Sequence, residues 1–254
     1  IRRPPRSTRK ESSAASDVYK RQTYNRVLLK LSGEWFSGEK EKGFDQSTFE
    51  IVSQTIKKTS DTQLAIVLGG GNIFRGKELK NLNIDQVSAD YIGMLSTIMN
   101  GIALSNYLTS QDCKNSLFSS FAIGNFVKAY SKEEADNALE SNNTVLLVGG
   151  LGNPLFTTDS TASVRAVELN SNIMLKATNV DGVFSTDPKI DANAKKYKNL
   201  TFNEAINKNL KVMDQTSLCF CRDYGLNVRV FDANQKNALI SAINGDEIGT
   251  LVHD

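Results

Sequence analysis

The sequence predicts an α/β fold in which a mostly parallel sheet is covered by helices on both faces. Three observations support this prediction. Apolar runs of strand length recur along the chain, each run ends in a glycine-rich or polar turn, and helical patterns alternate with the runs. The run at residues 64–68 contains no polar residue, which is typical of a strand buried on both faces. Strands that alternate with helices favour parallel pairing.

The first predicted elements are a strand and a helix. Residues 26–33 read as a strand that ends in a glycine turn. Residues 47–50, Ser-Thr-Phe-Glu, match the capping box that begins many helices. Phe49, Val52 and Ile56 then recur at helical spacing, which predicts a helix with one apolar face.

The middle of the chain is predicted to contain a long helix and two more strands. The helix covers residues 85–108, because Val87, Tyr91, Leu95, Ile98 and Ile102 recur there at helical spacing. Strands are expected at residues 144–150 and 172–178, a helix at 161–169, and a hairpin followed by a lysine-rich loop at 181–198. Ligands of such sheets bind beyond the carboxyl ends of the strands. We therefore expect the turns at residues 32–33, 69–72, 149–153 and 178–182 to converge on one site.

The composition excludes several classes of protein. No window approaches eighteen consecutive apolar residues, so a membrane-spanning helix is not predicted. Cys113, Cys219 and Cys221 are too few for a disulfide framework and fit a cytoplasmic location, and the pair at 219 and 221 reads as two ordinary helix residues. The only histidine, His253, is the second-last residue, which leaves no plausible histidine base or zinc site.

Residues 1–22 differ from the rest of the chain, because they are polar, rich in Arg and Ser, and aperiodic. A transit peptide and a basic arm for nucleic acid are two interpretations. The favoured one is a disordered, non-native leader that resembles a translated adapter sequence. Without the leader, the positive charges fall from 30 to 23 and the negative charges from 28 to 26, so the net charge moves from +2 to −3. The apparent basicity therefore gives no argument for binding nucleic acid.

The most informative stretch is residues 63–77, an apolar strand that leads into three glycines and then into Arg75 and Lys77. Bare backbone amides beside cations are a common phosphate site in α/β proteins. Gly71, four residues, Gly76 and Lys77 match the P-loop pattern, but Glu78 stands where a P-loop needs Ser or Thr for magnesium. We therefore predict a phosphate site of another kind.

Two cations are candidates for binding phosphate. Lys30 lies one residue from the end of an otherwise apolar strand, where an ammonium is costly unless an anion meets it. The alternative is a lysine whose ammonium reaches solvent from an edge strand. Arg75 follows the glycine run and could fork onto phosphate oxygens. Lys77 and Lys80 are expected to be solvated.

Several acidic and hydroxyl side chains have both a structural and a functional interpretation. Asp90, inside the long helix, is either a surface residue or an acceptor for sugar hydroxyls. The Thr-Thr-Asp-Ser sequence at residues 157–160 is first a helix N-cap, and it could also hold a polar ligand. Asp187 and Asp214 could orient cations or metal-bound water, although isolated carboxylates are more often structural.

Six strings, in this order along the chain, resemble those of the bacterial uridylate (UMP) kinases of the amino-acid kinase fold. They are KLSGE at 30–34, GGGNIFRG at 69–76, GMLSTIMNG at 93–101, GNPLFTTD at 152–159, KATNVDGVF at 176–184 and KVMD at 211–214. The resemblance implies a three-layer α/β/α sandwich formed by one domain, residues 23–254, with a UMP-binding lobe at about 23–170 and an ATP-binding lobe at about 171–254. It also implies transfer of the γ-phosphoryl group of ATP to UMP in pyrimidine nucleotide biosynthesis, with Mg²⁺. The family is typically homohexameric and regulated by GTP and UTP, without nucleic-acid or membrane partners.

The resemblance also implies roles for individual residues. The catalytic set is Lys30, Arg75 and Asp214, with Asp214 similar to the acid that organises the lysines. The ATP side comprises Lys30, Leu31, Ser32, Gly33, Gly71, Arg75, Thr178, Phe184 and Asp187. The UMP side comprises Gly70, Asp90, Leu151, Gly152, Asn153, Pro154, Leu155, Phe156, Thr157 and Thr158. Leu151 departs from the family, which usually has Thr there, so a polar contact to the nucleotide is lost at that position. No metal ligand is assigned.

Two alternative functions remain open. An amino-acid or carbamate kinase of the same fold would use ATP with a carboxylate or carbamate acceptor. A non-catalytic storage protein for nucleotides or oxyanions would bind ATP without transferring phosphate. The products formed from ATP with a panel of acceptors distinguish the three functions.

Overall fold

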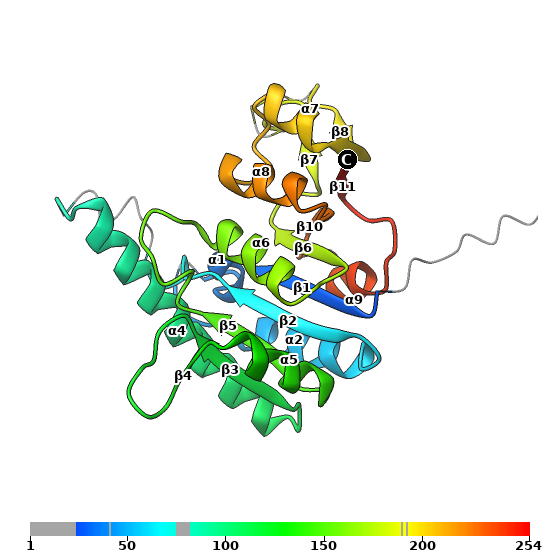
Figure 1. Ribbon diagram of the computed structural model, residues 1–254. Coiled ribbons are helices and arrows are strands. Elements are labelled where there is room, and N and C mark those ends of the chain that lie inside the picture. Colours follow the sequence, from blue (N-terminus) through cyan, green and yellow to red (C-terminus); the bar gives the residue numbers. More distant parts are fainter. Residues whose placement is uncertain (1–23, 41, 75–81, 189, 192) are drawn as a thin grey trace, which may run out of the picture.

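The computed structural model describes residues 24–40, 42–74, 82–188, 190–191 and 193–254. In the described part of the chain, nine strands form one sheet in the order β4-β3-β5-β2-β1-β6-β10-β11-β9 (Figure 1). The strands are β1 Arg26–Leu31, β2 Gln63–Leu68, β3 Asn115–Ser119, β4 Lys128–Ala129, β5 Thr144–Val148, β6 Ile173–Thr178, β9 Asn199–Thr201, β10 Val228–Asp232 and β11 Thr250–His253. A hairpin of β7 Val183–Phe184 and β8 Lys196–Tyr197 lies beside it.

The sheet is mostly parallel, as predicted. Among the described strands of this sheet, the pair β10 and β11 is the antiparallel exception. The central strands β1 and β2 are almost entirely buried, as expected for a sheet that is covered on both faces. The predicted hairpin within residues 181–198 is also present, because β7 pairs with β8.

Helices cover both faces of the sheet and form the predicted three-layer sandwich. One apolar core packs the sheet against α1 Gly33–Phe36, α2 Gln46–Lys58, α4 Gln86–Ser110 and α9 Ala238–Ile243. The other core packs it against α5 Lys132–Glu140, α6 Thr158–Glu168, α7 Phe202–Asn207 and α8 Gln215–Asp223. None of the described helices is both long enough and apolar enough to cross a membrane.

Two predicted helix boundaries were wrong by a few residues. Helix α2 begins at Gln46 rather than in the Ser-Thr-Phe-Glu pattern, because the side chain of Asp45 accepts a hydrogen bond from the Ser47 N–H and caps the helix. Helix α6 begins at Thr158 rather than at residue 161, because the Thr157 hydroxyl accepts hydrogen bonds from the backbone N–H groups of Asp159 and Ser160 and so caps the helix. The predicted capping sequence at residues 157–160 therefore lies largely inside the helix.

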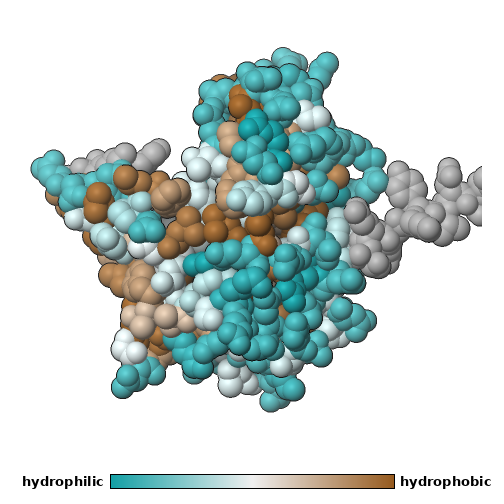
Figure 2. Space-filling model, in the orientation of Figure 1, coloured by the Kyte–Doolittle hydropathy of each residue, from teal (hydrophilic) through white to brown (hydrophobic). Residues whose placement is uncertain are grey.

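The long helix exists, but most of its predicted apolar face does not point into the core. Four of the five residues are exposed: Val87 by 42%, Tyr91 by 47%, Leu95 by 50% and Ile102 by 39%. The buried face carries small residues such as Ser96 and Gly101 beside larger apolar ones, and a Cβ on Gly101 would lie 2.6 Å from a methyl group of Val148. The backbone of α4 thus packs close to the sheet, and the apolar stripe faces outward. Figure 2 shows the resulting hydrophobic surface over α4.

Candidate functional site

Two lysines lie side by side at the carboxyl ends of the central strands. Lys30 in β1 is in register with Lys176 in β6. Alternate side chains of a strand point to opposite faces, so both ammoniums lie on the face that α6 covers, beside Leu28 and Met174. Their exposed fractions are 9% and 8%. Two buried cations on adjacent strands repel each other unless an anion lies between them.

The carboxylate of Asp159 is that anion. Asp159 lies in the first turn of α6, with Oδ1 at 3.1 Å from Lys30 Nζ and Oδ2 at 2.6 Å from Lys176 Nζ. Lys176 also donates to the backbone oxygen of Val212 at 2.6 Å. Lys176 is thus held by two acceptors, whereas Lys30 keeps N–H groups that can point toward a ligand.

The charges in this cluster shift the pKa of two of its members. Burial alone would raise the pKa of Asp159, but the ammoniums of Lys30 and Lys176 outweigh it and hold that pKa below its usual range. Burial lowers the pKa of Lys176, and the charge of Lys30 adds to this effect, while Asp159 opposes it. The site therefore carries one net positive charge when both lysines are protonated.

Asp214 organises the helix that presents Asp159. It caps α8, where Oδ1 accepts from the Ser217 N–H, and its Oδ2 accepts from the hydroxyls of Thr157 at 2.6 Å and Ser160 at 3.1 Å. Burial would raise the pKa of Asp214, but these hydrogen bonds keep it below its usual range. The resemblance assigned the organisation of the lysines to Asp214, whereas the residue that bridges the two ammoniums directly is Asp159. Asp214 instead accepts hydrogen bonds from hydroxyls at the start of α6, the helix that carries Asp159.

The glycine turn after β1, at residues 32–33, is in direct contact with the glycine turn after β2, at residues 69–72. A Cβ on Gly33 would lie 2.2 Å from the backbone nitrogen of Gly71, so only glycine fits at position 33. A Cβ on Gly70 would lie 2.8 Å from the backbone oxygen of Gly93 in α4. Within the described residues, no backbone acceptor is found for the N–H groups of Gly70 and Gly71. The turn therefore offers two amide donors to an anion.

Two cavities lie near the lysine cluster: Lys176 lines one, and Thr158, which directly precedes Asp159, lines the other. One, of about 380 Å³, is lined by Lys176, Thr178, Phe184 and Asp187 together with residues 208–212. The other, of about 190 Å³, lies between the glycine turn, α4 and the start of α6. Its lining includes Gly70, Gly71, Asp90, Asn153, Phe156, Thr157 and Thr158. Ten of the twenty predicted site residues thus line one or the other of these two cavities.

Asp90 already has two partners in the smaller cavity. Its Oδ1 accepts from Gln86 Nε2 at 2.8 Å, and its Oδ2 accepts from the Leu155 N–H at 2.7 Å. Leu155 has a φ of +71°, a left-handed conformation that costs energy for a branched side chain. Each carboxylate oxygen can accept more than one hydrogen bond, so Asp90 can still receive a ligand hydroxyl.

Not every predicted residue is placed in a cavity. Leu31 is fully buried and can offer only its backbone. Ser32 precedes α1, and its hydroxyl makes no capping hydrogen bond there. Leu151, Gly152, Pro154 and Leu155 form the loop beside the smaller cavity without lining it. Arg75, Lys77 and Lys80 lie outside the described residues.

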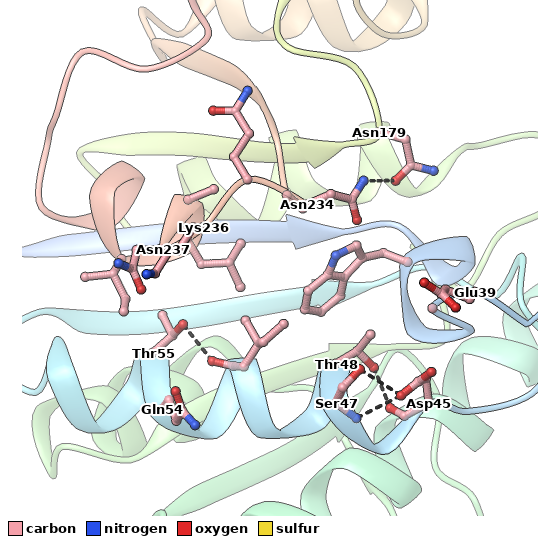
Figure 3. A pocket seen from close by; sticks show the side chains of 18 of the residues that line it. Glu39, Asp45, Ser47, Thr48, Gln54, Thr55, Asn179, Asn234, Lys236 and Asn237 are labelled. Atoms are coloured by element: carbon pink, nitrogen blue, oxygen red, sulfur yellow. Dashed lines mark hydrogen bonds between the residues drawn. The ribbon is translucent and has the colours of Figure 1, made fainter.

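A further cavity of about 670 Å³ lies on the opposite face of the sheet, between α2 and the loop from β10 to α9. None of the predicted site residues lines it. Figure 3 shows Asn234 donating to Asn179 on one side, at 3.4 Å, with Asp45, Ser47 and Thr48 on the other. Its described charged residues are the acids Glu34, Glu39 and Asp45 and the cation Lys236. This excess of negative charge makes it a poor site for phosphate.

The comparisons with known proteins agree with this geometry. The profile of the Amino acid kinase family matches residues 25–232. The chain belongs to the amino acid kinase family. A uridylate kinase of Alcanivorax borkumensis is 42% identical, with 90% of this chain and 92% of the relative covered. A uridylate kinase of Buchnera aphidicola is 43% identical, with 92% and 97% covered. The crystal structure of a UMP kinase from Bacillus anthracis has a TM-score of 0.88 at 36% identity, with 92% and 97% covered.

Sequence reasoning missed two members of this amino acid kinase site. Lys176 occupies the same kind of position as Lys30, near the end of an apolar strand, and that signal could have singled it out. Asp159 was interpreted as part of a helix cap that could also hold a polar ligand, and not as the partner of a lysine. Its role depends on the packing of α6 over β1 and β6, which a local pattern does not report.

Proposed function

We propose that the protein is a UMP kinase that transfers the γ-phosphoryl group of ATP to UMP and releases UDP and ADP. The observation that carries the proposal is the Lys30, Asp159 and Lys176 cluster with two cavities next to it, one lined by Lys176 and the other by Thr157 and Thr158 beside Asp159, because phosphoryl transfer needs a donor and an acceptor that share positive charge. The names of the relatives support this choice of acceptor. A carboxylate or carbamate acceptor has no observation in its favour.

The proposed reaction needs no general base. The acceptor oxygen belongs to a phosphate of UMP that is already anionic, so the lack of a histidine in the site costs nothing. Catalysis then consists of positioning and of neutralising charge. Lys30 faces the transferred group, Asp159 holds the Lys30 ammonium in place, and the N–H groups of Gly70 and Gly71 bind the acceptor phosphate. The resemblance assigns Gly71 to the ATP side, but we place it on the acceptor side because it lines the smaller cavity. The UDP formed would enter pyrimidine nucleotide biosynthesis.

The larger cavity is the proposed ATP side and the smaller one the proposed UMP side. The residues that line the two cavities fall between 176 and 230 for ATP and between 70 and 158 for UMP, which supports lobes at about 171–254 and 23–170. Among the described residues, no group of three His, Cys, Asp or Glu could hold a metal ion. We infer that Mg²⁺ binds mainly through the phosphates of ATP, where it would neutralise their charge.

A direct assay separates the candidate functions. The protein is incubated with ATP, Mg²⁺ and, in parallel, each nucleoside monophosphate and a set of amino acids, and the products are separated by chromatography. We expect UDP from UMP. A phosphorylated amino acid with no UDP would favour the alternative kinase, and ATP binding without any product would favour a storage protein. A Lys30→Met variant controls for a contaminating kinase.

Self-association is part of the proposal. The exposed apolar stripe of α4 comprises Val87, Tyr91, Leu95, Met99 and Ile102, and a contiguous apolar surface of this kind is typical of a protein interface. We propose that it contributes to a homohexamer in the cytoplasm, with GTP and UTP as effectors. Light scattering with size-exclusion chromatography tests the assembly, and Leu95→Lys should lower the mass. Titration of GTP and UTP into the assay tests the regulation.

A further inference from the structure

A pair of buried asparagines lies directly behind the glycine turn. Asn72 follows the three glycines, Asn100 lies in the middle of α4, and both have no exposed surface. Asn72 Nδ2 donates to Asn100 Oδ1 at 3.0 Å, and Asn100 Nδ2 donates to Asn72 Oδ1 at 2.7 Å. The two amides therefore form a closed, reciprocal pair inside the protein.

The remaining amide hydrogens connect this pair to the backbone. Asn100 Nδ2 also donates to the oxygen of Gly69 at 2.6 Å, and Asn72 Nδ2 also donates to the oxygen of Gly43 at 2.9 Å. Both acceptors are carbonyl oxygens, which settles the orientation of each amide. All four N–H groups of the pair thus have partners. Such a network specifies one arrangement, because an unpaired buried amide is costly.

The glycine turn depends on this support, because it has no side chains of its own. Gly69 donates its N–H to Leu31, and the N–H groups of Gly70 and Gly71 have no backbone acceptor among the described residues. Close approaches to Gly33 on one side and to Gly93 on the other leave little room for displacement. The bond from Asn100 to the Gly69 oxygen therefore helps to hold the adjacent amide donors at a defined place relative to Lys30.

We propose that Asn100 and Asn72 are positioning residues for the acceptor phosphate. They touch neither substrate. They orient the N–H groups of Gly70 and Gly71 in the smaller cavity, so that the acceptor phosphate is bound in line with Lys30. This inference rests on the proposed function for the identity of the acceptor, but the support of the turn itself does not depend on it.

The test compares Asn100→Ala, Asn72→Ala and the double variant with the unchanged protein. Asn115→Ala is the matched control, because Asn115 in β3 also connects α4 to the sheet. Its side chain forms hydrogen bonds with Ser105 and Thr109 near the C-terminal end of α4, and with the backbone of Cys113. Thermal unfolding is recorded first, and the kinetics are measured below the unfolding range of every variant. Hydrogen exchange of a peptide that contains residues 69–74 is measured in parallel.

We expect Asn100→Ala to raise the KM for UMP and lower kcat, on the order of tenfold each, with the KM for ATP nearly unchanged. The double variant should be no worse than the poorer single variant, because the pair acts as a unit. Exchange of residues 69–74 should increase in these variants, whereas Asn115→Ala should lower stability alone. If Asn100→Ala does not fold, Asn72→Ala carries the test, because it removes the hydrogen bonds that fix the Asn100 amide beside Gly69. The same changes in kinetics and exchange are then expected, in smaller size.

Two results would overturn the proposal: unchanged exchange and kinetics in the folded asparagine variants, or equal kinetic losses in Asn115→Ala. Failure of the proposed function is a separate result. In that case the unchanged protein forms no UDP, while the exchange of residues 69–74 still decides whether the pair supports the turn.

Discussion

Replacing Asp159 with Asn should remove the charge that allows two lysines to lie side by side. The carboxylate oxygens are 3.1 Å and 2.6 Å from the two ammonium nitrogens. At an effective dielectric constant of about 20, each contact corresponds to a gross attraction of about 5–6 kcal/mol, before the cost of desolvation is subtracted. Removing one partner of a buried ion pair costs about 3–5 kcal/mol in practice. We expect a loss of this size in the free energy of unfolding at pH 7.

The same change should also impair turnover. Without Asp159 the ammonium of Lys30 is repelled by Lys176 and leaves its place, so we expect kcat to fall on the order of a hundredfold, by analogy with the loss of one charge-stabilising donor. Burial and the neighbouring ammonium then lower the pKa of Lys176 further. The folded variant releases a proton that the unfolded chain keeps, so its stability should recover as the pH rises toward 10.

Urea unfolding monitored by circular dichroism and chromatographic measurement of UDP check both expectations. Asp136→Asn is the matched control, since Asp136 bridges Arg26 and Lys132 and its side chain is also largely buried, but it lies on α5 and lines neither cavity. The control should lose stability and keep its kcat. Wild-type stability and turnover in Asp159→Asn, or an equal loss of kcat in Asp136→Asn, would refute the reasoning.

Three more predictions concern individual side chains. Lys30→Met should lower kcat strongly while calorimetry shows UMP binding within a few-fold of the unchanged protein; a parallel loss of UMP binding would contradict a role in the transition state. Leu155→Gly should not reduce the melting temperature, because glycine relieves a left-handed backbone that costs about 1 kcal/mol and the leucine side chain is 71% exposed. Asp214→Asn should make the free energy of unfolding less dependent on pH in the acid range. The lowered pKa of Asp214 contributes stability above its unfolded pKa of about 4. That stability is lost as the pH falls through the pKa of the folded state. An equally steep pH dependence in the acid range of the variant would assign the effect to other carboxylates.

Much of the fold could be predicted because its signals are local. The strand at residues 64–68 was predicted from an unbroken apolar run and the long helix from Asp85 from apolar periodicity, and the structure confirms both elements. The apolar stripe that predicted α4 faces outward for the most part. Periodicity reports that one face is apolar, but it does not report whether the sheet or a partner covers that face. Here the small residues around Gly101 allow the closer packing and take the buried side.

The candidate site likewise combines features that local sequence patterns reveal with contacts that only the tertiary structure creates. By itself, the sequence favoured an anion beside Lys30, and it showed that a glycine run offers backbone amides and that the ordered strings resemble one family. The tertiary structure decided that Asp159 is this anion, that Lys176 shares it, and that Asn100 supports the glycine turn. These contacts join residues that are far apart in the chain and become neighbours only when β1 pairs with β6 and helices α4 and α6 pack on opposite faces of the sheet. A local pattern shows that a buried charge needs a partner, and only the packing of distant elements identifies which residue it is.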